Sequence, residues 1–118
     1  NVKPYKYYIP ESDVSMTAPK TLYNLTVETA LPRIKIYGTG NITLNVGGIP
    51  FVMKGVVKHI VLDSQLGIAY NESSAILLNE NSKVFTRKYP VLNPGSNAIS
   101  WTGTVTKVEI EPRWRTLV

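Results

Sequence analysis

The sequence has no cysteine and only one histidine, and these two shortages remove most metal and thiol chemistry. Without cysteine, a disulfide framework, a thiolate metal site and a cysteine nucleophile are all excluded. A zinc site needs several nitrogen or sulfur ligands, so His59 by itself predicts none. Its neighbours, Lys58 and Ile60, supply neither an acid nor a nucleophile. We therefore expect no metal, no cofactor and no catalytic residue around this histidine.

Long apolar runs and clusters of charge are also lacking. No apolar segment approaches the roughly 20 residues of a membrane span, and the first residues, Asn-Val-Lys-Pro, contain no signal-peptide core. The net charge of +5 favours anionic neighbours. However, the cations never occur three in a row, whereas nucleic-acid binding needs clustered cations interleaved with aromatics. We expect neither nucleic acid nor membrane as a partner.

The familiar catalytic motifs do not occur. The sequence has no G-x-S-x-G elbow, no phosphate-cradling loop and no calcium-loop spacing. Glu109 and Glu111 share one face of a predicted strand, but such spacing near a chain end is more typical of a solvent-facing side than of a paired acid and base. The expectation is a protein that is not an enzyme.

Two polar motifs have a structural interpretation. Asp63 follows a predicted strand and precedes Ser64, a position typical of an Asx turn. Asn24-Leu25-Thr26 matches the glycosylation sequon, as do residues 41–43 and 71–73, but this pattern is short and frequent by chance.

Alternating apolar and polar residues dominate the chain, of which 43% is hydrophobic. Residues 33–37 and 41–46 alternate on either side of Gly38-Thr39-Gly40, which predicts a hairpin. Residues 56–62 predict one further strand. Alternation returns at residues 105–111, after an expected break at Thr102-Gly103.

Many short strands without helical periodicity predict an all-β protein, either a β-sandwich or a barrel. Residues 1–12 contain Pro4 and Pro10 and little periodicity. They are interpreted as a linker from an upstream domain, leading to an edge strand near residues 14–17. The alternative to a domain of a longer protein is that the sequence is a mature, processed chain. Residues 13–118 are expected to form one domain.

The aromatic residues are the most informative side chains. Trp114 stands between Arg113 and Arg115, just after a proline, and Trp and Arg are enriched at interface hot spots. These three residues, together with Trp101 and Tyr37, are the candidate packing or interface anchors. The alternative is that aromatic rings form a platform for sugars, which stack on the same amphipathic rings.

Residues 89–103 and 105–115 resemble the end of the distal tail protein family of long-tailed bacteriophages. That family closes with a P-x-L-x-P-G-x-N-x-I turn and strand, followed by a strand that runs into P-R-W/Y-R. Residues 31–44 are similar to its P-x-I-x-I-x-G-x-G-x-I-x-L segment. Val61-Leu62-Asp63-Ser64 and Tyr70-Asn71 match its D-S/C-E … Y segment. The resemblance covers about residues 13 to 117.

This resemblance implies a galectin-like, jelly-roll-like β-sandwich of two antiparallel sheets, the outer domain of a tail-tip protein made in the bacterial host cytoplasm. The family's N-terminal half forms a hexameric ring. The outer domain serves as a docking module in the virion. Its implied partners are the tail-associated fibre or lysin protein and the baseplate or receptor-binding proteins.

The alternative function is a carbohydrate-binding module for host cell-wall glycans. Sugar-binding galectins carry an H-x-N-P-R segment and a W-G-x-E/R segment. Here the histidine lies in Lys58-His59-Ile60, and the tryptophan is followed by Thr102-Gly103. Neither segment matches, so no sugar-binding residue is carried over to this chain.

Overall fold

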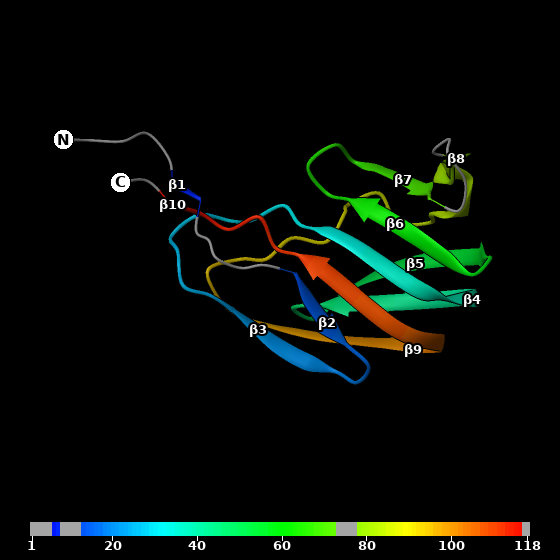
Figure 1. Ribbon diagram of the computed structural model, residues 1–118, viewed down its shortest axis with the longest axis horizontal. Coiled ribbons are helices and arrows are strands. Elements are labelled where there is room, and N and C mark those ends of the chain that lie inside the picture. Colours follow the sequence, from blue (N-terminus) through cyan, green and yellow to red (C-terminus); the bar gives the residue numbers. More distant parts are fainter. Residues whose placement is uncertain (1–5, 8–12, 73–77, 117–118) are drawn as a thin grey trace.

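A computed structural model describes residues 6–7, 13–72 and 78–116 (Figure 1). These residues form strands almost throughout, and the short 3₁₀ turn η1 is the helical segment among them. The elements are β1 (Lys6–Tyr7), β2 (Val14–Met16), β3 (Lys20–Asn24), β4 (Arg33–Val46), β5 (Ile49–Val56), β6 (His59–Asp63), β7 (Ile68–Asn71), β8 (Leu78–Asn79), η1 (Asn81–Lys83), β9 (Gly95–Glu111) and β10 (Arg115–Thr116).

Strands β2 to β9 belong to one antiparallel sheet with the order β2-β9-β4-β6-β7-β8. In addition, β3 pairs with β9 and β5 pairs with β4. Strands β1 and β10 pair with each other, next to the chain ends (Figure 1). The all-β expectation is confirmed, whereas the division into two sheets of a galectin-like sandwich stays a prediction.

The two long central strands, β4 and β9, both bend. Residues 33–37 of β4 pair with β6 and with residues 107–111 of β9. Beyond the bend, residues 42–46 pair with β5, and residues 43–46 pair with residues 99–102 of β9. The pairing register shifts in both strands at the bend. As a result the sheet folds back on itself, as the course of β4 and β9 in Figure 1 shows.

One hydrophobic core fills the space inside this fold. Ile34 and Ile36 from the first half of β4 and Ile42, Leu44 and Val46 from its second half belong to a single buried cluster. Their alternation with half-exposed residues is what period two predicts for a strand with one buried face. The sheet therefore covers its own apolar side.

Close backbone contact at the bend explains two of the glycines. A Cβ added at Gly38 would lie 2.2 Å from the carbonyl oxygen of Thr104, and one added at Gly103 would lie 2.5 Å from that of Asn41. Gly103 also has a φ of 108°, which L side chains rarely adopt. Glycine is needed here because β4 and β9 turn against each other.

The predicted hairpin around Gly38-Thr39-Gly40 is wrong. Residues 33–46 form one strand, and its two halves pair with other strands instead of with each other. The glycines bend a continuous strand, because the contact that needs them comes from β9, which is distant in the sequence. The hairpin instead uses Gly47-Gly48, between β4 and β5.

Two other predicted boundaries also differ. Residues 56–62 are divided between β5 and β6 by a tight turn, in which Lys58 has a φ of 65° and the His59 N–H donates to the Val57 carbonyl at 2.7 Å. Conversely, β9 continues through Thr102-Gly103, where a break was predicted. The expected edge strand near residues 14–17 is confirmed as β2. Most of the predicted linker lies outside the described residues.

Replacing Gly103 with alanine should destabilise the protein by about 2 kcal/mol more than replacing Gly95 does. Both glycines lie in β9 with positive φ, 108° and 96°, so both alanines carry backbone strain. Only at Gly103 does the new Cβ meet backbone atoms, since nothing lies within 4 Å of that position at Gly95. Urea unfolding measures both losses, and equal losses would contradict the close approach of β4 and β9.

Candidate functional site

Outward-pointing residues of β9, β4, β6 and β7 form a dense polar surface, which we call the charged face. Three rows cross it by strand pairing. They are Glu111–Arg33–Asp63, Glu109–Lys35–Val61–Tyr70 and Lys107–Tyr37–His59, with Glu72 beyond the end of β7. Val61 and Asp63 are buried beneath their neighbours in these rows. Opposite charges stand next to each other in the first two rows, so the face is organised by its own ion pairs.

Tyr37, a predicted anchor, lies near the centre of this face. Its ring lies between two ammonium groups, with Lys35 Nζ at 4.9 Å and Lys107 Nζ at 4.6 Å from the ring centroid. Its hydroxyl donates to Glu109 Oε1 at 3.1 Å. Lys107 and then Tyr37 hold the pKa of Glu109 below its usual value. Tyr37 therefore binds neighbours within this chain.

Glu72 completes the other end of the charged face. Its carboxylate pairs with Arg33 and, at 3.2 Å, with Lys35 Nζ. Arg33 also donates from Nε to the Tyr70 hydroxyl at 2.9 Å. These side chains are roughly one quarter exposed, so each pair contributes little to stability. The charges of Arg33, Lys35 and Glu72 therefore compensate one another on this face.

His59 is held as a neutral imidazole at the border of this face. Its Nε2 accepts a hydrogen bond from the Glu72 N–H at 3.0 Å, which requires that nitrogen to be unprotonated. Burial, followed by the charge of Lys35, lowers the pKa of His59 below its ordinary 6.5. This contact gives His59 a structural role.

Arg113, another predicted anchor, forms the most buried ion pair of the described residues. Its two terminal nitrogens bind the two oxygens of Asp63, each at 3.0 Å. The Asp63 side chain is 8% exposed and also accepts from the Gln65 and Leu66 N–H groups. Arg113 lowers the pKa of Asp63. The predicted Asx turn at Asp63 is confirmed, and the ion pair ties the segment after β9 to it.

The remaining predicted anchors do not gather into one site. Trp101 and Trp114 are half-buried and pack against the core, as a packing role predicts. Arg115 lies in β10, but its side chain is outside the described residues. Tyr37 and Arg113 lie on or beside the charged face. Tyr37, Trp101 and Trp114 therefore lie in different parts of the fold.

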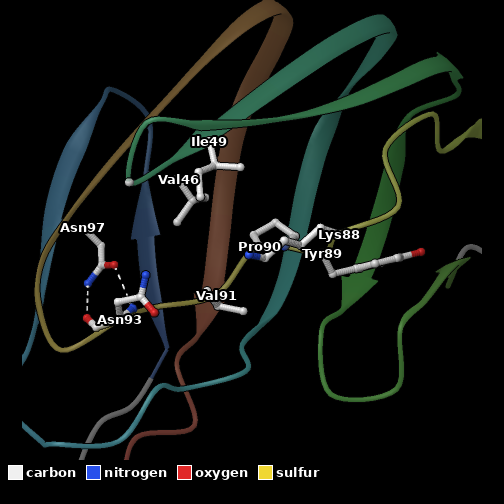
Figure 2. A pocket seen from close by; sticks show the side chains of 9 residues that line it. Val46, Ile49, Lys88, Tyr89, Pro90, Val91, Asn93 and Asn97 are labelled. Carbon is white, nitrogen blue, oxygen red and sulfur yellow. Dashed lines mark hydrogen bonds between the residues drawn. The ribbon is translucent and has the colours of Figure 1, made fainter.

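A small pocket lies between the β4–β5 turn and residues 88–97 (Figure 2). Its volume of about 20 Å³ holds about one water molecule. Asn97, only 2% exposed, accepts from the Asn93 N–H at 2.9 Å and donates to the Asn93 and Gly95 carbonyls at 2.9 and 3.1 Å. The polar groups here close a turn and leave little for a ligand.

The other half of the sheet presents a patch of uncharged outward residues, which we call the uncharged face; Lys54, the next outward residue of β5, borders it. Cross-strand pairs place Thr21 beside Ala98 and Tyr23 beside Ser96. The surface continues over the outward residues of β9, β4 and β5. These are Ser100, Thr102, Thr43, Asn45, Pro50 and Val52. In a chain with 21 charged residues (13 cations and 8 anions), this contrast with the charged face separates two kinds of surface.

The loop after β3 extends the uncharged face with exposed apolar side chains. Leu25 is 94% exposed and Val27 79%. Asn24 holds this loop: its Nδ2 donates to the Glu28 and Leu92 carbonyls, both at 2.9 Å, and its Oδ1 accepts from the Thr26 N–H at 2.9 Å. Asn24 is itself 3% exposed, so the sequon at this position serves the loop and not a glycan.

Sequence reasoning did not find the uncharged face or the exposed loop. The signal available was the absence of charge from residue 21 to residue 27, where Tyr23, Leu25 and Val27 alternate. The alternation of Tyr23, Leu25 and Val27 is visible in the sequence. Which side of this segment faces solvent, however, depends on its contacts with β9. The Arg113–Asp63 pair had no local signal, because it joins residues far apart in the chain.

No group of three or more potential metal ligands occurs among the described residues. Within the same ranges, no helix is long and apolar enough to cross a membrane. No protein-family model matches this chain, and no match was found among curated proteins or solved structures.

Replacing Arg113 with alanine should lower the free energy of unfolding by about 2–3 kcal/mol, because Asp63 stays buried without its partner. Arg113→Lys should recover only part of the lost free energy of unfolding, since an ammonium cannot make the bidentate contact with the Asp63 carboxylate. The control is Arg87→Ala, at an exposed position, with an expected change within about 0.5 kcal/mol. Urea unfolding measures all three. If Arg113→Ala lost no more free energy of unfolding than Arg87→Ala, the stabilising role of the Arg113–Asp63 ion pair would be contradicted.

Stability should fall as the pH drops below about 6.5. The folded-state pKa of His59 is lowered, so the unfolded chain takes up a proton first and gains free energy relative to the fold. The loss levels off below the folded-state pKa, where both states are protonated. Urea unfolding at two pH values on either side of the ordinary pKa measures it. In His59→Gln this part of the pH dependence should vanish, and its persistence would contradict the role of His59.

Proposed function

We propose that this chain is a non-enzymatic docking module of the tail tip of a long-tailed bacteriophage, the outer domain of a distal tail protein. The starting point is the order of family-like segments along the chain. The observation that carries the proposal is that residues of these segments contact one another in the fold. These contacts support the proposal because residues of different segments then serve one fold together.

The contacts join segments that are far apart in sequence. Asp63 of residues 61–64 binds Arg113 of the Pro112-Arg113-Trp114-Arg115 ending, with both contacts at 3.0 Å. Gly103 of residues 89–103 lies against Asn41 of residues 31–44, so close that a Cβ at Gly103 would be 2.5 Å from the Asn41 carbonyl oxygen. Shared motifs with such roles are expected to mark a shared fold.

The bent sheet supports a galectin-like sandwich in particular. Strands β2, β6 and β7 lie with one half of the bent pair β4–β9, and strands β3 and β5 with the other half. Both halves contribute to one core. Two layers over one core are what a β-sandwich requires, so the galectin-like architecture is part of the proposal.

Docking is favoured over sugar binding by the surfaces. Protein interfaces are depleted of charge at their centres, and the uncharged face fits this composition in its lack of charge. A sugar platform needs several exposed rings side by side, whereas Trp101 and Trp114 pack against the core. The implied partners are other proteins of the virion tail tip, and no cofactor is part of the proposed function.

Immunogold labelling of phage particles that carry this chain tests the proposal. Antibodies against the purified chain should label the tail tip, because the module is proposed to be part of the virion there. Antibodies preabsorbed with the purified chain are the control. Label on the head or along the tail tube, or an unlabelled tip, would overturn the assignment.

Titration of the chain with host cell-wall polysaccharide tests the rival glycan function. We expect no heat of binding at sugar concentrations of about 1 mM, a limit that would still reveal weak lectin affinity. Saturable binding would favour a carbohydrate-binding module instead.

A further inference from the structure

Strand β3 is an edge of the sheet with one unpaired side. It pairs with residues 95–99 of β9, and no other strand of the described part of the chain lies beside it. An unpaired edge presents a row of N–H and C=O groups that can pair with another chain.

The direction of these backbone groups follows from β9. The Gly47 N–H donates to the Ala98 carbonyl at 2.9 Å, so the backbone groups of Ala98 point toward β4. Backbone direction alternates along a strand, so Asn97 and Ile99 point toward β3 and bond with Leu22 and Lys20, their register partners. The N–H and C=O groups of Thr21 and Tyr23 therefore point to the free edge.

This edge lacks the features that normally protect one. Lysines, prolines and bulges discourage pairing with other chains. Pro19 and Lys20 stand at the start of β3, but residues 21–27 contain neither charge nor proline. Along the same stretch Tyr23 is 63% exposed, Leu25 94% and Val27 79%.

The segment is also held in place before any partner arrives. Asn24 donates to the Glu28 and Leu92 carbonyls, and the Thr26 hydroxyl lies within hydrogen-bond distance of Asn24 Oδ1, at 2.7 Å, and of the Glu28 carbonyl, at 3.0 Å, and donates its one proton to either. A rigid binding surface loses less conformational entropy on association. The exposed side chains of Leu25 and Val27 are therefore presented by an ordered loop.

We propose that a second copy of this chain pairs with β3, antiparallel and centred on Leu22, so that the sheet continues across a symmetric dimer. In this register Thr21 of each copy lies opposite Tyr23 of the other. The backbone N–H and C=O groups of Thr21 and Tyr23 point to the free edge in both copies, so each Thr21–Tyr23 pair exchanges two backbone hydrogen bonds. Their side chains form aromatic–β-branched pairs, which favour antiparallel association.

The charges at the two ends of β3 complement this arrangement. Lys20 begins the strand, and Glu28 follows it in the loop. Antiparallel pairing brings the Lys20 end of one copy beside the Glu28 end of the other. The partner is thus a second copy with a surface that is complementary to itself, as a two-fold interface requires.

The pairing is short, so the dimer should be weak. Interfaces well below about 1,200 Å² are typical of transient association, and we expect a dissociation constant between about 10 µM and about 1 mM. This inference is independent of the proposed function. A monomeric chain would overturn it and leave the tail-tip assignment untouched.

Sedimentation equilibrium of the chain from about 10 µM to about 1 mM tests the dimer. Two variants attack it in different ways. Thr21→Pro removes an N–H that points to the free edge and spares the pairing with β9. Tyr23→Lys places a charge in the interface. The control is Leu66→Lys in the β6–β7 turn, because Leu66 is 65% exposed and Tyr23 63%.

The mass should rise from monomer to dimer in the native chain and in Leu66→Lys. Both β3 variants should stay monomeric over the whole range, with native circular dichroism. A native chain that stays monomeric at about 1 mM would overturn the proposal. So would a dimer that persists in folded Thr21→Pro and Tyr23→Lys, or one that Leu66→Lys abolishes equally. If Thr21→Pro does not fold, Tyr23→Lys decides.

Discussion

The close approach of β4 and β9 at their common bend is the constraint on which the rest of the structure depends. Gly38 lies against Thr104, and Gly103 lies against Asn41, with no room for a Cβ at either glycine. Because both central strands turn there, the connections from β5 to β6 and from β2 to β3 lead from one half of the bent sheet to the other. The apolar sides of both halves then meet in one core.

The same bend divides the surface into two faces of different character. One half carries its cations and carboxylates in cross-strand rows, where Lys35, Tyr37 and Glu109 satisfy one another. The other half is covered by small uncharged side chains and ends at β3, with Tyr23 at its free edge. The charged face is thus occupied by internal contacts, and the uncharged face is the surface on which the proposed docking rests.

Local rules were sufficient for the elements and insufficient for their connections. Period-two alternation correctly indicated strands at residues 33–37, 41–46 and 105–111, and the Asx turn at Asp63 follows from its position after a strand. The glycines at 38–40 were assigned to a hairpin, because a glycine-rich turn and a glycine that admits a neighbouring strand have the same local sequence. The difference lies in Thr104, about sixty residues further along.

The sequence by itself determined that the protein is built from strands and that thiol chemistry is excluded, because the chain has no cysteine. These properties follow from residue type and alternation, which are local. Only the tertiary structure decided that Arg113 binds Asp63, that Asn24 is buried, and that Tyr23 stands at an open edge. Each of these depends on which distant strand lies alongside, and pairing between strands is set by long-range contacts that no local pattern encodes.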